Sequence, residues 1–209
     1  FLLRPSTRIH LGWGQYVQHP DLQWLYSRVG NRGLLPERAN HFLVALEERL
    51  GERTRLRMEF YHRQDRDLLF RSFYEPRLIG GHIFNPPTDP PMGNALRGYA
   101  RGMEIFLQRR SANRLSGWVS YALGYTNLRD PAAGISFPSN QDQRHTVNVY
   151  LSYRLRPTVN LSVKSLYGSG FPMPGFYRRE DAQYFLSETR NSLRMDAYQR
   201  ADFRINKAH

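Results

Sequence analysis

Residues 101–127 contain two runs in which apolar and polar positions alternate. In the first run, Met103, Ile105 and Leu107 fall on one side of an extended chain, and smaller or more polar residues mostly fall on the other. After the polar link 109–114, one side of the second run carries Leu115, Val119, Tyr121, Leu123 and Tyr125. An alternation with period two predicts β-strands, and two such runs joined by a short link predict an antiparallel hairpin.

These two strands differ from most strands of soluble sheets in their length and in the contrast between their sides. Each is expected to span about ten residues or more, which is the length of a tilted membrane strand. One side is continuously apolar with aromatic residues at its ends, and the other side is small and polar. This pattern is typical of a transmembrane β-barrel, whose strands face lipid outside and water inside.

The same alternation predicts further strands at residues 7–13, 37–48, 54–70, 145–155, 158–168 and 198–207. Taken by itself, the segment 37–48 is also compatible with a helix. Between the strands, short turns alternate with long connections at residues 14–36, 71–97, 129–144 and 169–195. Every second connection of a meander returns to the same rim, so the long segments are expected to gather at one end and the turns at the other.

The expected fold is therefore all-β: an antiparallel meander of about eight strands that forms a curved, open fragment of a large transmembrane barrel. A soluble sandwich would instead pack the apolar side against a second sheet. In the barrel, the convex side should carry Leu56, Met58, Phe60, Met103, Ile105, Leu107, Val119, Tyr121, Leu123, Val147, Val149, Leu151, Val159, Leu161 and Val163.

The charge of the chain raises a different interpretation. Lys and Arg number 30 against 18 Asp and Glu, which gives a net charge of +12, and only Lys164 and Lys207 are lysines. A soluble basic β-protein that binds nucleic acid is therefore one alternative. Such binding needs arginines interleaved with aromatic residues on one face. The arginines here mostly oppose the aromatic side, so no nucleic-acid partner is expected.

The sequence offers few candidate residues for catalysis or metal binding. The chain has no cysteine, which excludes disulfides and thiolate metal sites. His62 falls on the opposite side of its strand from Asp65 and Asp67, so neither a metal site nor a cofactor is predicted. The Gly-Ser-Gly segment at 168–170 lacks the flanking residues of a nucleophile elbow, and no enzyme is expected. An outer-membrane barrel protease or lipase is the remaining alternative, and it needs a Ser/His or Asp/His pair at the strand ends.

Two groups of residues are candidates for binding a solute. The first faces the polar side of the strands, where it either guides solute or forms mutual ion pairs across strands: Arg57, Glu59, Glu104, Arg200, Asp202 and Arg204. The second lies in the long segments, where polar and aromatic residues either bind solute or pack the loops: His82, Phe84, Asn85, Phe171, Phe176 and Tyr177. The arginines of the first group favour an anionic solute.

The order of several short motifs resembles the C-terminal part of the barrel of TonB-dependent outer-membrane receptors. Pro36-Glu37 is similar to the start of a strand that descends after a large outer loop. The segment 61–69 resembles the aromatic-to-Asp-Leu end of the next ascending strand, and Gly102-Met103-Glu104 is similar to the start of the strand that follows. The segment 198–205 resembles a strand shortly before the end of the barrel. Together the motifs span nearly the whole chain.

The resemblance implies that residues 1–209 are part of a roughly 22-stranded barrel domain, with the plug domain and the closing strands outside this sequence. It implies a location in the bacterial outer membrane and energy-coupled uptake of a scarce solute. A ferric siderophore, a cofactor or an oligosaccharide would fit. The implied partners are the lipid bilayer, the N-terminal plug of the same full-length chain, the TonB energy-coupling complex and the small-molecule or oligosaccharide substrate.

Overall fold

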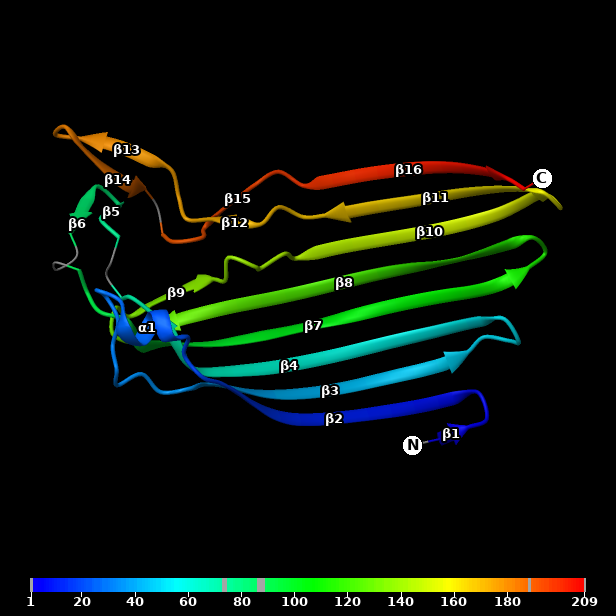
Figure 1. Ribbon diagram of the computed structural model, residues 1–209, viewed down its shortest axis with the longest axis horizontal. Helices are drawn as coiled ribbons and strands as arrows, with labels where there is room; N and C mark the ends of the chain where they lie inside the picture. Colours follow the sequence, from blue (N-terminus) through cyan, green and yellow to red (C-terminus); the bar gives the residue numbers. More distant parts are fainter. Residues whose placement is uncertain (1, 73–74, 86–88, 188, 209) are drawn as a thin grey trace.

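The computed structural model describes residues 2–72, 75–85, 89–187 and 189–208. Within these ranges, ten strands form one sheet in the order β1-β2-β3-β4-β7-β8-β10-β11-β16, with β9 beside β8. Each strand pairs antiparallel with its neighbour (Figure 1). The strands are β1 (Leu2–Arg4), β2 (Thr7–Gln18), β3 (Glu37–Arg49), β4 (Thr54–Phe70), β7 (Gly93–Ala112), β8 (Leu115–Asp130), β9 (Ile135–Pro138), β10 (His145–Arg156), β11 (Val159–Gly168) and β16 (Tyr198–Lys207).

The predicted all-β meander is confirmed, and the ambiguous segment at 37–48 is strand β3. Its residues pair along their whole length with β2 on one side and β4 on the other, so the sheet outweighs any local helical tendency. The strands also extend further than predicted at one end, since β2 continues to Gln18 and β7 already begins at Gly93. These extensions lack the continuous apolar side, which is why the alternation alone did not mark them.

The register places the alternating apolar positions of the long strands on one face, called here the outer face, while Leu43, Phe106 and Trp118 lie on the other. One row crosses the sheet through Ile9, Leu46, Met58, Ile105, Tyr121, Val147 and Tyr167. Many of its side chains are exposed, including Phe60 at 53% and Phe203 at 79%. All the apolar residues predicted for a single side lie on this face. In the described part of the chain it packs against no second sheet, as a sandwich would require.

The four long connections gather at one end of the sheet, called the loop end, and the tight turns lie at the other, the turn end (Figure 1). Backbone hydrogen bonds join these connections: Met92 N–H donates to Val29 O (2.8 Å), and Leu186 N–H to Pro76 O (3.1 Å). At the turn end, Asn113 and Arg114 have φ values of 51° and 70°. Positive φ at both central residues matches the twist of a tight hairpin.

The long connections contain more regular structure than their sequence indicates. A four-stranded sheet, the loop sheet, has the order β13-β14-β5-β6 and joins the connection 71–92 to the connection 169–197. Its central pair, β14 and β5, is parallel, unlike the antiparallel main sheet. These elements are β5 (Arg77–Ile79), β6 (His82–Phe84), β13 (Tyr177–Glu180) and β14 (Gln183–Ser187), and nearby lie β12 (Pro172–Met173), β15 (Leu193–Arg194) and α1 (Leu22–Tyr26). No helix in the described ranges is long and apolar enough to cross a membrane.

Burial is concentrated where the loops fold over the polar side of the sheet, called here the inner face. Leu96, Ala100 and Phe137 are 3%, 7% and 1% exposed, although the sheet has only one layer. Leu96 and Ala100 come from β7, and Phe137 comes from β9. The nearest equivalent of a hydrophobic core is therefore the set of buried side chains between the strands and the loops at the loop end.

Candidate functional site

A cavity of about 890 Å³ lies between the inner face and the loops. Its wall includes His41 of β3 together with Arg63 and Asp65 of β4. Its cover includes the residues 139–141 and Arg190. The wall residues share one face because the strand period is two. The cover residues come from connections that meet the wall only in the folded chain.

A second hollow, of about 430 Å³, continues along the inner face toward the turn end. Tyr16, His41 and Arg63 line both spaces, so the two are adjacent. The second hollow also contains Glu59 and Glu104, which stand directly opposite each other on β4 and β7. The two spaces form a continuous groove, lined by both polar and apolar residues, on the side of the sheet that faces away from the outer face.

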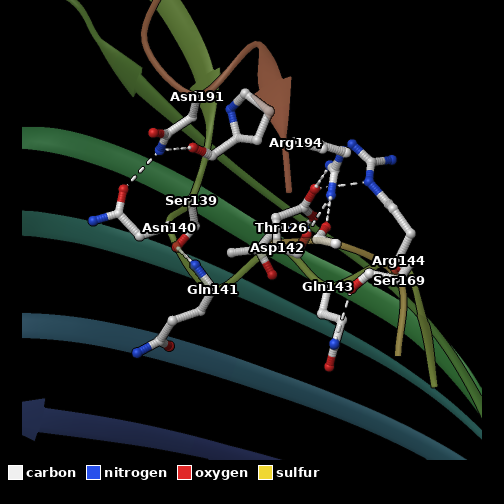
Figure 2. A network of polar contacts seen from close by, with 12 residues as sticks. Thr126, Ser139, Asn140, Gln141, Asp142, Gln143, Arg144, Ser169, Asn191 and Arg194 are labelled. Carbon is white, nitrogen blue, oxygen red and sulfur yellow. Dashed lines mark hydrogen bonds and ion pairs between the residues drawn. The ribbon is translucent and has the colours of Figure 1, made fainter. Parts of the chain in front are cut away.

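The cover is held in place by Asp142, whose side chain is fully buried (Figure 2). Its Oδ1 accepts a hydrogen bond from the Thr126 N–H at 2.6 Å, and its Oδ2 binds the guanidinium groups of Arg144 and Arg194. Arg194 also donates to the carbonyl oxygens of Asp142 (2.7 Å) and Gly170 (3.1 Å). Because a buried carboxylate needs compensating charge and hydrogen bonds, this network ties the last loop to the β9–β10 connection and to β8.

Asn191 makes a second link between the same two loops. Its side-chain nitrogen donates to Pro138 O and to Asn140 Oδ1, both at 2.7 Å (Figure 2). The residue is 1% exposed and has a φ of 60°, a conformation that asparagine tolerates better than most residues. Asn140 lines the cavity, so this bond positions part of the cover.

An aromatic and charged cluster closes one side of the cavity. The guanidinium of Arg190 lies 5.7 Å from the ring centres of both Phe70 and Phe137, which are themselves 6.0 Å apart. Arg190 also forms an ion pair with Glu75. The cluster joins the end of β4, the β9 segment and the last loop in one contact.

The charged residues of the inner face are mostly paired with each other. Arg63 lies 2.9 Å from Asp65, Arg57 lies 2.6 Å from Glu59, and the Arg200 and Asp202 side chains are 2.9 Å apart. Each of these three pairs joins residues two apart on one strand, whereas Arg55 of β4 and Glu47 of β3 form a pair across strands at 3.4 Å. Arg204 donates to Asn206 Oδ1 at 2.8 Å. The inner face therefore supplies less unpaired positive charge than the arginine content indicates.

The structure separates the predicted inner-face residues into two places. Arg57, Glu59 and Glu104 lie on the adjacent strands β4 and β7, and the two glutamates line the second hollow. Arg200, Asp202 and Arg204 lie on β16, which is five positions from β4 in the sheet order. At about 4.8 Å per strand, this separation is roughly 24 Å. The two groups do not form one site.

The predicted loop residues also divide. His82 and Phe84 are on β6, and Asn85 follows them, while Phe176 precedes β13 and Tyr177 begins it. Because β6 and β13 are the two edges of the loop sheet, these groups flank it and are exposed. Phe171 lies apart, next to β12, where its carbonyl oxygen accepts from the Met195 N–H at 2.9 Å.

Sequence reasoning missed His41, Arg63 and Asp65 as cavity residues, although their place on the polar side of β3 and β4 was a usable signal. It had no signal for Arg190 or for the segment 139–141, because their position depends on contacts between distant loops. In the described residues, no three His, Asp or Glu side chains are grouped closely enough to hold a metal ion. Where β4 lines the cavity, a bulge between Asp65 and Leu68 interrupts its register with β7.

A single-layer meander with an apolar outer face and a loop-covered groove on its inner face defines a wall segment of a membrane β-barrel. A family model described as TonB dependent receptor-like, beta-barrel, matches residues 1–208. The chain belongs to this family. The outer-membrane location that the resemblance implied is thereby confirmed.

Solved receptors share this fold over the whole chain. The FrpB iron transporter from Neisseria meningitidis has 14% sequence identity and a TM-score of 0.68, over 100% of this chain and 31% of its own. The ferric-catecholate import receptor Fiu from E. coli K12 has 12% identity and a TM-score of 0.68, over 98% of this chain and 27% of its own.

The outer-membrane ferripyoverdine receptor of Pseudomonas aeruginosa has 13% identity and a TM-score of 0.68, over 97% of this chain and 25% of its own. The chain thus spans about a quarter to a third of the length of these receptors. No curated protein matches the chain in sequence.

Proposed function

We propose that residues 1–209 form part of the barrel wall of a TonB-dependent receptor that imports a metal chelate, such as a ferric siderophore. The observation that carries this proposal is the covered cavity at the loop end of the inner face. Its volume of about 890 Å³ is within the range of sites that hold small molecules of drug size. A solute arriving from outside would meet the loop sheet first and then this cavity.

The chemistry of the route favours a solute with many hydrogen-bonding groups. The wall of the cavity carries Tyr16, His41 and the Arg63–Asp65 pair, which together offer donors, acceptors and an aromatic surface. Positive charge is supplied instead by the loop sheet, where Arg178 and Arg179 of β13 are exposed and form no ion pair with any residue that the structure describes. An anionic chelate would therefore be attracted at the loops and held by neutral and paired groups below them.

The similar receptors are described as an iron transporter, a ferric-catecholate import receptor and a ferripyoverdine receptor, which supports a metal chelate as the solute class. The other partners follow from the family: a plug domain inside the barrel, the TonB complex and the surrounding lipid bilayer. A transport role needs no catalytic group, and the exposed apolar outer face favours lipid over nucleic acid as its neighbour.

Uptake of radioactive iron by cells that express the full-length receptor tests the proposal, with a panel of ferric catecholates and ferric hydroxamates. Changing His41→Ala together with Arg63→Gln should lower the uptake of one chelate severalfold, and Phe84→Ala with Phe171→Ala should lower its binding. The control is Arg154→Gln at the turn end, where the side chain is exposed. Equal uptake by the cavity variant and the control, or no uptake of any chelate, would overturn the proposal.

A further inference from the structure

The outer face changes character near the loop end, where arginines take the place of apolar side chains. Along β7, the apolar positions end at Met103, and the same face continues with Arg101, Tyr99 and Arg97. The strands β3, β4 and β8 also carry arginines on the outer face near the loop end, and the register of the sheet brings these arginines together. We call the resulting cluster the basic patch: Arg38, Arg66, Arg97, Arg101 and Arg129.

Four of these arginines stand in direct cross-strand pairs of like charge. Arg38 is opposite Arg66 on β3 and β4, and Arg97 is opposite Arg129 on β7 and β8. Like charges directly opposite each other destabilise a sheet. Among the described residues, none of the five arginines forms an ion pair, in contrast to Arg57, Arg63 and Arg200 on the inner face. The five arginines of the patch therefore have no ion-pair partner in the part of the chain that the structure describes.

The patch surrounds a hollow of about 760 Å³. Arg38, Arg66, Arg97 and Arg101 line it, and the Arg101 guanidinium lies 5.0 Å from the ring centre of Tyr99. Tyr99 in turn stacks on His62 at 6.5 Å. These ring contacts hold the guanidinium in place without neutralising its charge.

Two carboxylates also line this hollow. Asp65 is bound by Arg63 on the inner face, so its charge is already compensated. Asp67 is the second, and among the described residues it forms no ion pair. One acid against four arginines leaves the hollow strongly positive.

The position of the patch relative to the apolar band places it beside lipid headgroups. Arg101 lies two residues before Met103, toward the loop end, which is about 7 Å along a strand. A headgroup layer extends roughly 5–8 Å beyond the hydrocarbon on each side of a bilayer. Guanidinium groups bind phosphate through paired hydrogen bonds.

We propose that the basic patch binds the phosphate groups of anionic lipids in the outer half of the outer membrane, with one headgroup seated in the hollow. The bound phosphates would supply the missing counter-charge for both arginine pairs. The proposal relies on the outer-membrane location of the chain and is independent of which solute the receptor imports.

Native mass spectrometry of the full-length receptor in detergent, titrated with lipid A, tests this site. Lipid A is a glycolipid with two phosphate groups. The patch variant carries Arg66→Gln and Arg97→Gln, and the matched control carries Arg154→Gln and Arg156→Gln at the turn end, so both lose two exposed arginines. At about 1 kcal/mol per basic residue near an anionic membrane surface, the patch variant should bind lipid A roughly thirtyfold more weakly, and the control should bind it normally.

Two further ligands identify the source of the phosphate. A dephosphorylated form of the same glycolipid should bind poorly to the unmodified receptor, and millimolar inorganic phosphate should not displace lipid A. Equal lipid A binding by the patch variant and the control would overturn the proposal, as would equal binding of the dephosphorylated lipid or full displacement by phosphate. Chelate uptake is measured in a separate experiment. The lipid A binding results can therefore still be interpreted if the transport proposal fails.

Discussion

The phenol of Tyr61 lies directly over Gly102, on the inner face where β4 and β7 pair. A β-carbon on Gly102 would stand 2.6 Å from the Tyr61 hydroxyl oxygen and 2.2 Å from the backbone oxygen of Leu123. The next glycine across the sheet, Gly124, would bring a β-carbon 3.1 Å from the same hydroxyl. The ring therefore fills the space that two glycines leave open, below the covered cavity.

Replacing Gly102→Ala should destabilise the folded barrel, because the neighbouring backbone cannot move away as a side chain could. We expect a loss of about 1–3 kcal/mol, the usual cost of overpacking. Urea unfolding in detergent, followed by the shift in gel mobility of folded barrels, measures it. Gly93→Ala is the control on the same strand, where the nearest atom would be 3.9 Å away. Equal stability of the two variants would show that Tyr61 does not constrain Gly102.

The Asp142 network should keep the cavity cover closed. Changing Asp142→Asn removes the charge that holds Arg144 and Arg194, although both arginines keep some access to water. Because of that access, we expect a cost of about 2 kcal/mol, below that of a fully buried ion pair. Amide hydrogen exchange in residues 139–144 and 189–195 should then rise roughly thirtyfold.

The control for the cover is Asp181→Asn, at the exposed tip of the hairpin β13–β14. Its φ of 45° suits asparagine, so the backbone should not change. Exchange that rises to the same extent in both variants, or in neither, would mean that Asp142 does not hold the loops.

The assignment of outer and inner faces predicts opposite results for two adjacent residues of β10. Val149 lies on the outer face, between Val119 and Ser165, and Asn148 lies on the inner face. Val149→Arg should cost about 2–4 kcal/mol because it places a charge in hydrocarbon. Asn148→Arg should cost little folding stability, because the inner face is in contact with water. Folding into lipid vesicles measures both, and equal costs would contradict the assignment of the faces.

The strands could be predicted because their signal is local. The alternation of Met103, Ile105 and Leu107 marks both the strand and its lipid-facing side, and no distant contact can change that parity. The in-strand charge pairs could also have been read from Arg57 and Glu59, which stand two residues apart. The expectation of pairs across strands overlooked this spacing.

The covered cavity could not be predicted, because it depends on residues that are far apart in sequence. Arg194 reaches Asp142 from 52 residues away, and Arg190 reaches Glu75 from 115 residues away. Both contacts join separate long connections, whose paths carry no periodic signal. The parallel pairing of β14 with β5 has the same origin.

The most direct test of the account asks whether an imported chelate occupies the covered cavity. Residues 1–209 contain no cysteine, so a single thiol can be placed in this segment once any cysteine elsewhere in the full-length receptor has been changed to serine. Ala39→Cys puts it in the wall of the cavity, and Arg156→Cys puts it at the turn end. The labelling rate of each by a water-soluble maleimide is measured in the purified full-length receptor, with and without the ferric chelate that the cells take up. The account predicts that the chelate slows labelling at residue 39 severalfold and leaves residue 156 unchanged. An unchanged rate at residue 39, with a chelate known to be imported, would contradict it.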